Sequence, residues 1–254
     1  MTLDLDVALS TAREAAAAAA EVIRYYWEHG AAVEIKADAT PVTVADREAE
    51  SAIRSILATA YPEHAIFGEE QGQQGEGDWL WLVDPLDGTK SFVRGTPFFS
   101  TQIALMYRGE LVLGVSSAPI FGETLWARRG GGAFRDGEPL RVATTTNISD
   151  ASLSTGNVRS MAGDARWAAL GSLIREVNRI RGYGDFCHYH LLARGGLDVV
   201  IESDVNILDI AALAVIVREA GGVFTDLHGA PLSLATTSVL AAVPDLHASV
   251  LARF

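Results

Sequence analysis

Residues 79–89 of this 254-residue chain read Trp79-Leu80-Trp81-Leu82-Val83-Asp84-Pro85-Leu86-Asp87-Gly88-Thr89. Five apolar residues followed abruptly by two carboxylates predict a strand covered on both faces, with polar groups gathered at its end. Pro85 cannot donate to a central ladder, so we place the strand end at Asp84. Gly88 allows close backbone approach to a ligand, and the amides beside it favour an anion if the chain then turns helical. The stretch predicts a site for a divalent cation and an anion; the alternative is an Asx-type turn that caps a helix.

Other acids also stand at the borders of apolar segments. Glu69 and Glu70 follow a short strand-like segment, Asp46 precedes a helical pattern, and Asp209 opens a long apolar run. The plain interpretation of Asp46 and Asp209 is that each is a helix N-cap. Buried carboxylates, however, need a cation or a proton. A set of oxygen donors without cysteine or paired histidine favours Mg²⁺, Mn²⁺ or Ca²⁺ over zinc.

Four separated blocks of the chain contain these acids. They are Lys36 with Val42-Thr43-Val44-Ala45-Asp46, Gly68-Glu69-Glu70, Asp84-Pro85-Leu86-Asp87-Gly88-Thr89, and Leu208-Asp209-Ile210-Ala211-Ala212 followed by Glu219-Ala220-Gly221-Gly222. In this order and spacing the blocks resemble the inositol monophosphatase superfamily of metal-dependent phosphatases. The resemblance implies an αβαβα layered sandwich, of mixed α+β and α/β type, with two intimately packed lobes. We expect an N-terminal α+β lobe over residues 1–143, with an antiparallel sheet and most metal ligands, and a C-terminal α/β lobe over residues 144–254.

The resemblance also implies a role for individual residues of the metal site. The implied metal ligands are Glu69, Asp84, the Leu86 carbonyl, Asp87 and Asp209. They would hold two to three Mg²⁺ ions, which Mn²⁺ can replace. Asp46, Thr89 and Glu69 are the implied catalytic residues, which direct a water at the phosphate without a covalent intermediate. Gly88 and Thr89 would bind the substrate.

Two further positions bear on the resemblance. Lys36 is similar to a family lysine that supports the metal site, although a solvated surface lysine is the simpler interpretation. Leu208 stands where the family usually has tryptophan before its last metal-binding aspartate. This difference should alter packing around Asp209 without removing a ligand.

The substrate must be inferred from other segments. Residues 90–97 and 181–186 resemble the bacterial histidinol-phosphatase branch, and the Gly-Tyr-Gly-Asp-Phe block that ends at Phe186 is the better marker. Histidinol phosphate has an amine and an imidazole, so an acidic wall of Asp185 and Glu202 would attract it. The same acids can bond the hydroxyls of a sugar or inositol phosphate, and Asp185 also fits a plain turn.

We therefore expect an Mg²⁺-dependent phosphomonoesterase that hydrolyses L-histidinol phosphate in histidine biosynthesis. The alternative is an inositol-1-monophosphatase or a broad phosphatase for small polyol or nucleotide phosphates. A haloacid-dehalogenase mechanism with Asp84 as nucleophile is less suitable, because those enzymes separate their two acids by one residue and this chain separates them by two. A non-catalytic metal-binding regulator would have little use for Thr89.

Composition narrows the class further. The chain is 49% hydrophobic, enough for a large core, and its net charge of −12 argues against nucleic-acid binding. Its single cysteine excludes an internal disulfide. Asp4 and Asp6 stand where a secretory signal needs basic residues, and the helix-like run from Ala15 to Ala20 has charged flanks. We expect a cytoplasmic protein with no membrane partner, and the resemblance implies a homodimer.

Two other motifs do not indicate a binding site. Gly130-Gly131-Gly132 lacks the spacing of a dinucleotide loop. Cys187, His188 and His190 are expected on one helix but pointing apart, which argues against zinc and makes them core or surface residues. Helices are expected over about 3–28, 46–61, 165–177, 187–194 and 210–220, with a strand hairpin over 98–118.

Overall fold

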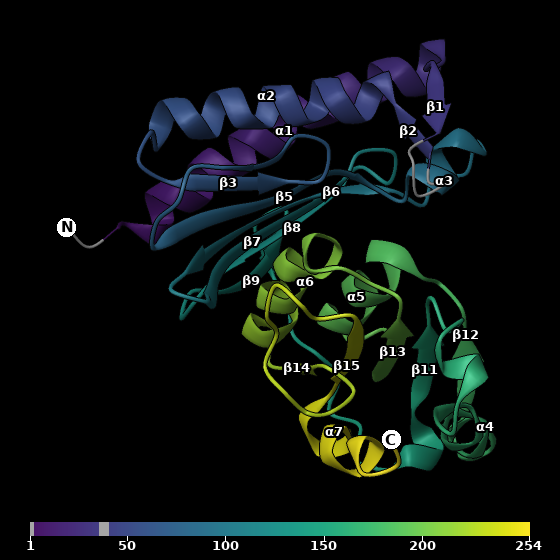
Figure 1. Ribbon diagram of the computed structural model, residues 1–254. Helices are drawn as coiled ribbons and strands as arrows, with labels where there is room; N and C mark the ends of the chain where they lie inside the picture. The colour runs from purple at the N-terminus through teal and green to yellow at the C-terminus, as the bar shows by residue number, and fades with distance from the viewer. Residues whose placement is uncertain (1–2, 36–40) are drawn as a thin grey trace.

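The computed structural model describes residues 3–35 and 41–254 (Figure 1). The N-terminal half holds α1 (Leu5–His29), β1 (Val33–Ile35), β2 (Pro41–Thr43), α2 (Val44–Ala60), β3 (Ala65–Gly68), β4 (Gly72–Gln74), β5 (Trp79–Asp87), α3 (Thr89–Val93), β6 (Ser100–Tyr107), β7 (Glu110–Ala118), β8 (Glu123–Arg128), β9 (Gly132–Arg135) and β10 (Glu138–Pro139). The C-terminal half holds β11 (Ser152–Thr155), α4 (Arg166–Glu176), β12 (Arg179–Arg181), α5 (Asp185–Ala193), β13 (Val199–Ser203), α6 (Ile207–Glu219), β14 (Val223–Thr225), β15 (Ser238–Ala242) and α7 (Pro244–Leu251), with short 3₁₀ turns at Ile148–Asp150 and Met161–Gly163.

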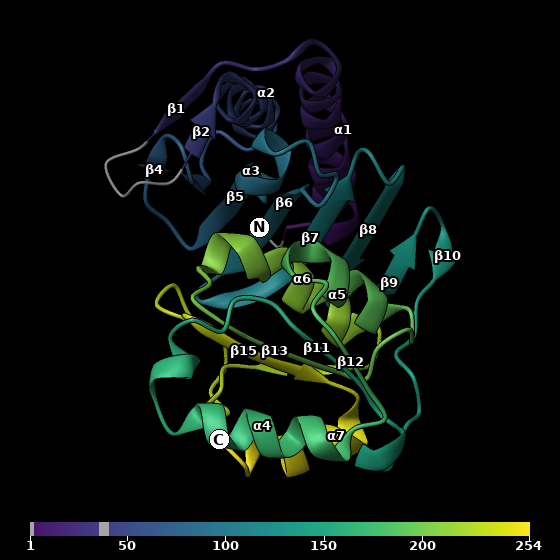
Figure 2. The same ribbon diagram turned by 90° about the vertical axis from the view of Figure 1, so that its right-hand side faces the viewer.

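These elements form five layers. Helices α1 and α2 cover one face of an eight-stranded sheet, and α5 and α6 separate that sheet from a five-stranded one (Figures 1 and 2). Helices α4 and α7 lie on the far side of the second sheet (Figure 2). The αβαβα sandwich expected from the sequence is confirmed. The expected helices are present, with ends shifted by up to three residues.

Strand β5 lies inside the larger sheet, between β3 and β6, in the order β10-β9-β8-β7-β6-β5-β3-β4. Its side chains alternate between the two faces, as a pleated strand requires. Trp81 and Val83 join the core under α1 and α2, whereas Leu82 joins the core shared with α5 and α6. The continuous apolar run is therefore explained by burial on both faces.

The end of β5 differs from the expectation, because the strand continues through Pro85 to Asp87. The register changes there: Asp84 lies opposite Gln102 and Asp87 opposite Ser100, so two residues of β5 face one of β6. Such a bulge leaves residues outside the regular ladder, and proline is tolerated at that place. Both carboxylates thus come from one bulge instead of from a strand end and a separate turn.

The helix caps also differ from the plain interpretation of the acids. Thr43 is the N-cap of α2 and Asn206 the N-cap of α6, whereas Asp46 and Asp209 occupy the third helical position. Each aspartate accepts the backbone N–H of its cap residue, at 2.8 Å from Thr43 and 3.0 Å from Asn206. These capping boxes orient both carboxylates before any ligand binds.

The core is continuous between the two halves of the chain. Helix α6 packs on β5, β6 and β7 of the first sheet, and its residues share one core cluster with Leu82 and Ala104. The division at residues 143 and 144 falls between β10 and the turn at Ile148 and remains a prediction. In the part of the chain that the structure describes, no helix is both long and apolar enough to span a bilayer.

Helix α6 approaches the sheet closely at Gly114 in β7. A Cβ placed on Gly114 would lie 2.4 Å from the carbonyl oxygen of Ala212. We expect Gly114→Ala to lower the free energy of unfolding by about 1–3 kcal/mol, because backbone must move. Gly171 in α4 is a matched control with nothing within 4 Å, and its alanine variant should be neutral or slightly stabilising. Urea denaturation measures both, and equal stabilities would contradict the close packing.

Candidate metal centre

A polar cavity of about 240 Å³ lies where β5, α3, α5 and α6 meet. Its walls are Pro41, Glu69, Asp84, Leu86, Asp87, Gly88, Thr89, Lys90, Ser91, Asn157, Asp185, Asp204, Asn206 and Asp209. A larger surface hollow of about 550 Å³, lined in part by Arg13 and Trp126, has a single acid, Asp136. The gathering of carboxylates therefore identifies the smaller cavity as the candidate site.

Asp84, Asp87 and Asp209 form the centre of this cavity. One carboxylate oxygen from each lies within 4.8 Å of the others. The bulge in β5 supplies two of the acids, and the first turn of α6 supplies the third from more than a hundred residues later in the chain. The Leu86 N–H donates to Asp84 Oδ1 at 3.0 Å, and the Ser100 hydroxyl donates to Asp87 Oδ2 at 3.3 Å.

The electrostatics of the three acids favour a cation. Burial, with the neighbouring charge of Glu69, raises the pKa of Asp84 well above its usual value. Burial also raises the pKa of Asp87, with Asp185 as the next contribution, and it raises the pKa of Asp209 to about 7. Carboxylates in this state must hold protons or share a cation. A donor set of oxygens alone fits a hard divalent ion.

Glu69 and Leu86, two further predicted ligands, also line the cavity. Glu69 follows β3, its backbone N–H donates to the Val83 carbonyl at 3.1 Å, and it lines the cavity beside Asp84. Leu86 lines the same cavity, although its side chain is fully buried in the core. Its carbonyl oxygen lies 3.0 Å from the hydroxyl of Thr89.

Thr89 and Asp46 form a pair beside the metal ligands. The Thr89 hydroxyl also lies 2.9 Å from Asp46 Oδ1, while Asp46 Oδ2 accepts the hydroxyl of Thr43 at 2.6 Å. Burial raises the pKa of Asp46, and the hydrogen bonds from Thr43 and Thr89 oppose part of that rise. An ionised Asp46 accepts the hydrogen bond of the Thr89 hydroxyl, which leaves the lone pairs of the Thr89 oxygen free to accept a hydrogen bond from a water.

Gly88 makes a close approach that no other residue can make. Its φ is +89°, and a Cβ there would lie 2.6 Å from the Phe98 carbonyl oxygen. Both the left-handed backbone and the lack of space require glycine. The segment from Gly88 to Ser91 can therefore form one wall of the cavity with its main chain.

Asp185 lies on the cavity wall, as we expected. It is the first residue of α5 and has a φ of +45°, a strained value that aspartate tolerates better than most residues. Burial raises the pKa of Asp185 to about 6, with the charge of Glu202 as the next cause, while His188 and Lys90 oppose the rise.

Glu202 lies behind the wall instead of on it, which corrects the expected pair of acids. Its side chain is 3% exposed, and its oxygens accept from Tyr189 Oη at 2.8 Å and the Asn157 backbone N–H at 3.0 Å. His188 Nε2 lies 3.1 Å from the same carboxylate. Glu202 is not among the residues that line the cavity, because both of its oxygens are turned to Tyr189, His188 and Asn157. Glu202 supports Asn157 and α5 instead.

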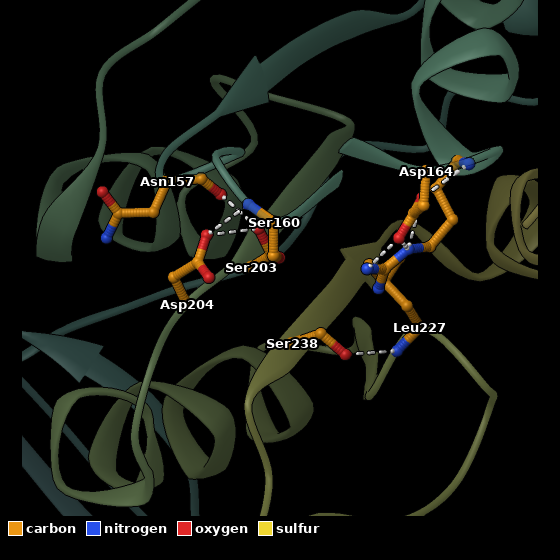
Figure 3. Close-up of polar contacts among 8 residues, drawn as sticks. Asn157, Ser160, Asp164, Ser203, Asp204, Leu227 and Ser238 are labelled. Atoms are coloured by element: carbon orange, nitrogen blue, oxygen red, sulfur yellow. Dashed lines mark hydrogen bonds and ion pairs between the residues drawn. The ribbon is translucent and has the colours of Figure 1, made fainter. Parts of the chain in front are cut away.

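Asp204 and Asn157 belong to the cavity wall but were not expected from the sequence. Asp204 Oδ2 accepts from the Ser160 backbone N–H at 3.0 Å and the Ser203 hydroxyl at 2.9 Å (Figure 3). The Ser203 N–H donates to the Asn157 carbonyl at 2.6 Å. Figure 3 shows the Asn157 side-chain amide directed away from these contacts. The φ of Asp204 is +58°, a conformation without a clear sequence signal at an Asp-Val pair.

The histidines of α5 point apart, as expected, but they are more than core residues. His190 Nε2 lies 2.7 Å from the Ser116 hydroxyl, and its Nδ1 lies 2.8 Å from Glu123 Oε1. This order resembles a catalytic triad. Ser116 is fully buried, however, so a substrate cannot reach it. The contacts tie α5 to β7 and β8. Lys36 lies outside the described residues.

The fold and the cluster of acids, which could hold a metal ion, fit a phosphomonoesterase. The chain belongs to the Inositol monophosphatase family, whose sequence model matches residues 4–254. It is 42% identical over 208 residues to a histidinol-phosphatase of Streptomyces coelicolor, covering 78% of each chain. It is also 37% identical over 214 residues to an inositol-1-monophosphatase of Rhizobium meliloti, covering 82% of this chain and 80% of that one. The extragenic suppressor protein suhB of Bartonella henselae has a similar structure, with a TM-score of 0.90, 30% identity, and coverage of 97% of this chain and 98% of that one.

The buried His190 predicts a pH dependence of stability. Burial lowers the pKa of His190 below 6.5, against the opposing effect of Glu123, while Arg194 and Arg135 also lower it. Protons are then taken up on unfolding, so this stability is present above about pH 6.5 and is lost as the pH falls below it. We expect wild type to lose more unfolding free energy than His190→Gln between pH 7.5 and 5.5. Denaturant titrations at both values test this, and parallel losses would contradict a neutral buried imidazole.

Proposed function

We propose that this protein hydrolyses L-histidinol phosphate to L-histidinol and phosphate with Mg²⁺ as cofactor. The observation that carries the proposal is the acid Asp185 in the same cavity as the carboxylate cluster. One part of the cavity suits a phosphate with its cations, and the other suits a cationic amine. The 42% identity to a histidinol-phosphatase supports the same choice.

The metal centre would be held by Glu69, Asp84, the Leu86 carbonyl, Asp87 and Asp209. Divalent ions in such a centre lower the pKa of a bound water and neutralise charge on the phosphoryl group. The chain has no need of a covalent intermediate, because the attacking water has its own positioning groups. Most of the catalysis then comes from orientation and charge neutralisation.

Thr89 and Asp46 direct the water. The Thr89 hydroxyl donates to ionised Asp46 and accepts a hydrogen bond from the water, which fixes the water at the phosphorus. Asp46, with its pKa raised by burial, is suited to accept a proton from the attacking water by way of the Thr89 hydroxyl. Gly88 lets the phosphoryl oxygens approach the main chain, since a side chain at that position has no room.

Asp185 selects the alcohol part of the substrate. Its carboxylate would pair with the ammonium of histidinol phosphate in a cavity partly shielded from water, where a charge pair is stronger than at the surface. The volume of about 240 Å³ suits a small monoester. The proposal includes a role in histidine biosynthesis, action in the cytoplasm and a homodimer, with no nucleic-acid or membrane partner.

Inositol 1-phosphate is the second candidate substrate. Asn157 and Asn206 line the cavity as neutral polar residues, and neutral donors and acceptors suit the hydroxyls of a polyol. The relative from Rhizobium meliloti bears the name of that activity. Asp185 can also accept a hydroxyl proton, so charge alone does not separate the two substrates.

A side-by-side assay of phosphate release tests the choice. Purified protein would be given histidinol phosphate, inositol 1-phosphate, fructose 1,6-bisphosphate and 3′-phosphoadenosine 5′-phosphate, each with Mg²⁺ and with EDTA. We expect the highest kcat/KM with histidinol phosphate, and no turnover in EDTA. A higher kcat/KM for inositol 1-phosphate would reverse the order of the two candidates. No phosphate from any ester would refute the proposed activity.

Removal of one ligand charge should stop the reaction. We expect Asp84→Asn and Asp209→Asn each to lower kcat by more than about 100-fold, since changes even outside the ligand shell cost about 10–100-fold. Asp245→Asn, an exposed acid of α7 far from the cavity residues, is the matched control. Activity near that of wild type at ordinary Mg²⁺ would rule out these residues as ligands.

Substitution of Asp185 should change substrate preference more than chemistry. We expect Asp185→Asn to raise KM for histidinol phosphate about tenfold, which corresponds to about 1.4 kcal/mol. It should raise KM much less for a phosphate ester whose alcohol part carries no charge. Asp150→Asn, an exposed acid, serves as control. Equal increases for both esters would remove the reason for preferring an amine substrate.

A further inference from the structure

Helix α2 has a row of buried polar side chains. Asp46, Glu50 and Arg54 follow one another at four-residue intervals, and their exposed fractions are 1%, 0% and 7%. This spacing puts them on one side of a helix, over roughly 12 Å of its length. Ala49 and Ile53, next to them, belong to the apolar core.

Glu50 holds the turn that follows β3. Its Oε2 accepts the backbone N–H of Glu70 at 2.7 Å, and its Oε1 accepts the N–H of Gln71 at 3.1 Å. Arg54 Nε donates to Glu50 Oε1 at 2.7 Å, and Arg54 Nη2 donates to the Gly72 carbonyl at 2.5 Å. One buried ion pair thus binds the main chain of three successive residues.

The turn lies directly on this ion pair. A Cβ on Gly68 would be 2.3 Å from Glu50 Oε1 and 2.8 Å from Arg54 Nη2. Gly68 precedes Glu69, the acid that lines the cavity beside Asp84. The backbone on both sides of Glu69 is therefore in contact with α2: Gly68 by packing, and Glu70 by a hydrogen bond.

The partners of this ion pair indicate a role besides fold stability. A buried ion pair is weak as a source of stability, because desolvation offsets the attraction between its charges. Here both oxygens of Glu50 accept backbone hydrogen bonds from the turn that follows Glu69. The same helix, one turn earlier, holds Asp46 at the Thr89 hydroxyl.

We propose that Glu50 is a positioning residue for the metal centre. Its carboxylate, neutralised by Arg54, fixes Glu69 relative to the Asp46–Thr89 pair through the rigid length of α2. The role of Glu69 as a ligand rests on the proposed function, whereas the hold of Glu50 on the turn is a property of the fold. Mutation of groups that orient metal ligands in this way typically costs about 10–100-fold in metal affinity or activity.

The test is direct Mn²⁺ binding to the full-length chain, measured by electron paramagnetic resonance of free Mn²⁺, with the Mg²⁺ concentration for half-maximal activity as a second readout. Glu50→Gln keeps the shape but gives the two turn amides an uncharged partner. Glu48→Gln makes the same change at an exposed position of the same helix. We expect Glu50→Gln to weaken Mn²⁺ binding and raise the Mg²⁺ half-saturation by about 10–100-fold. Glu48→Gln should stay within about twofold of wild type.

A second variant covers the case in which Glu50→Gln does not fold. Arg54→Lys keeps the charge beside Glu50 but cannot hold both Glu50 and Gly72 with a planar fork. Arg54→Lys should also weaken Mn²⁺ binding, by a smaller factor than Glu50→Gln. Mn²⁺ affinity equal to that of Glu48→Gln in the folded variants, with only the melting temperature lowered, would overturn the positioning role. Weakened Mn²⁺ binding in a protein whose wild type releases phosphate from no ester would support the role and refute the proposed function.

Discussion

The buried carboxylates of the site repel one another, and the rest of the structure has to offset this repulsion. Asp84 and Asp87 are held in one bulge of β5, and Asp209 is brought to them by the first turn of α6. Burial and like charge raise the pKa of each, so the arrangement is stable only with protons or a cation between them. The rest of the fold holds these groups in place despite that repulsion, by two-sided burial of β5 and by capping boxes.

Those parts of the fold and site that follow from local pattern could be predicted from the sequence. The run from Trp79 to Val83 indicates a doubly covered strand, and Glu69, Asp84, Asp87 and Asp209 each stand at the border of an apolar segment. Their convergence could be expected because such borders gather at one end of a layered fold. The bulge at Pro85 could not be predicted, because a proline in an apolar strand pattern by itself indicates the end of the strand.

The remaining features depend on contacts between distant segments. Glu202 looks like a wall acid until His188 and Tyr189 are known to lie against it. Glu50 looks like one of many helix glutamates, because its partners belong to a turn about twenty residues later. Asp204 lies on the cavity wall because its backbone is left-handed, and the residues next to it in the sequence do not predict that conformation. In each case the decisive information is which element packs opposite, and no local pattern contains it.

The origin of the three central acids has a mechanical consequence. Two come from the first sheet and one from a helix of the C-terminal half, so an ion bound among them would add a crosslink between parts of the chain that are otherwise joined by apolar packing and by polar contacts such as those of His190. A bound divalent ion would then slow the separation of α6 from the first sheet. The ion-free protein would exchange its amide hydrogens at this interface faster. The supply of the divalent ion would in this way set the lifetime of the folded protein as well as its rate of catalysis.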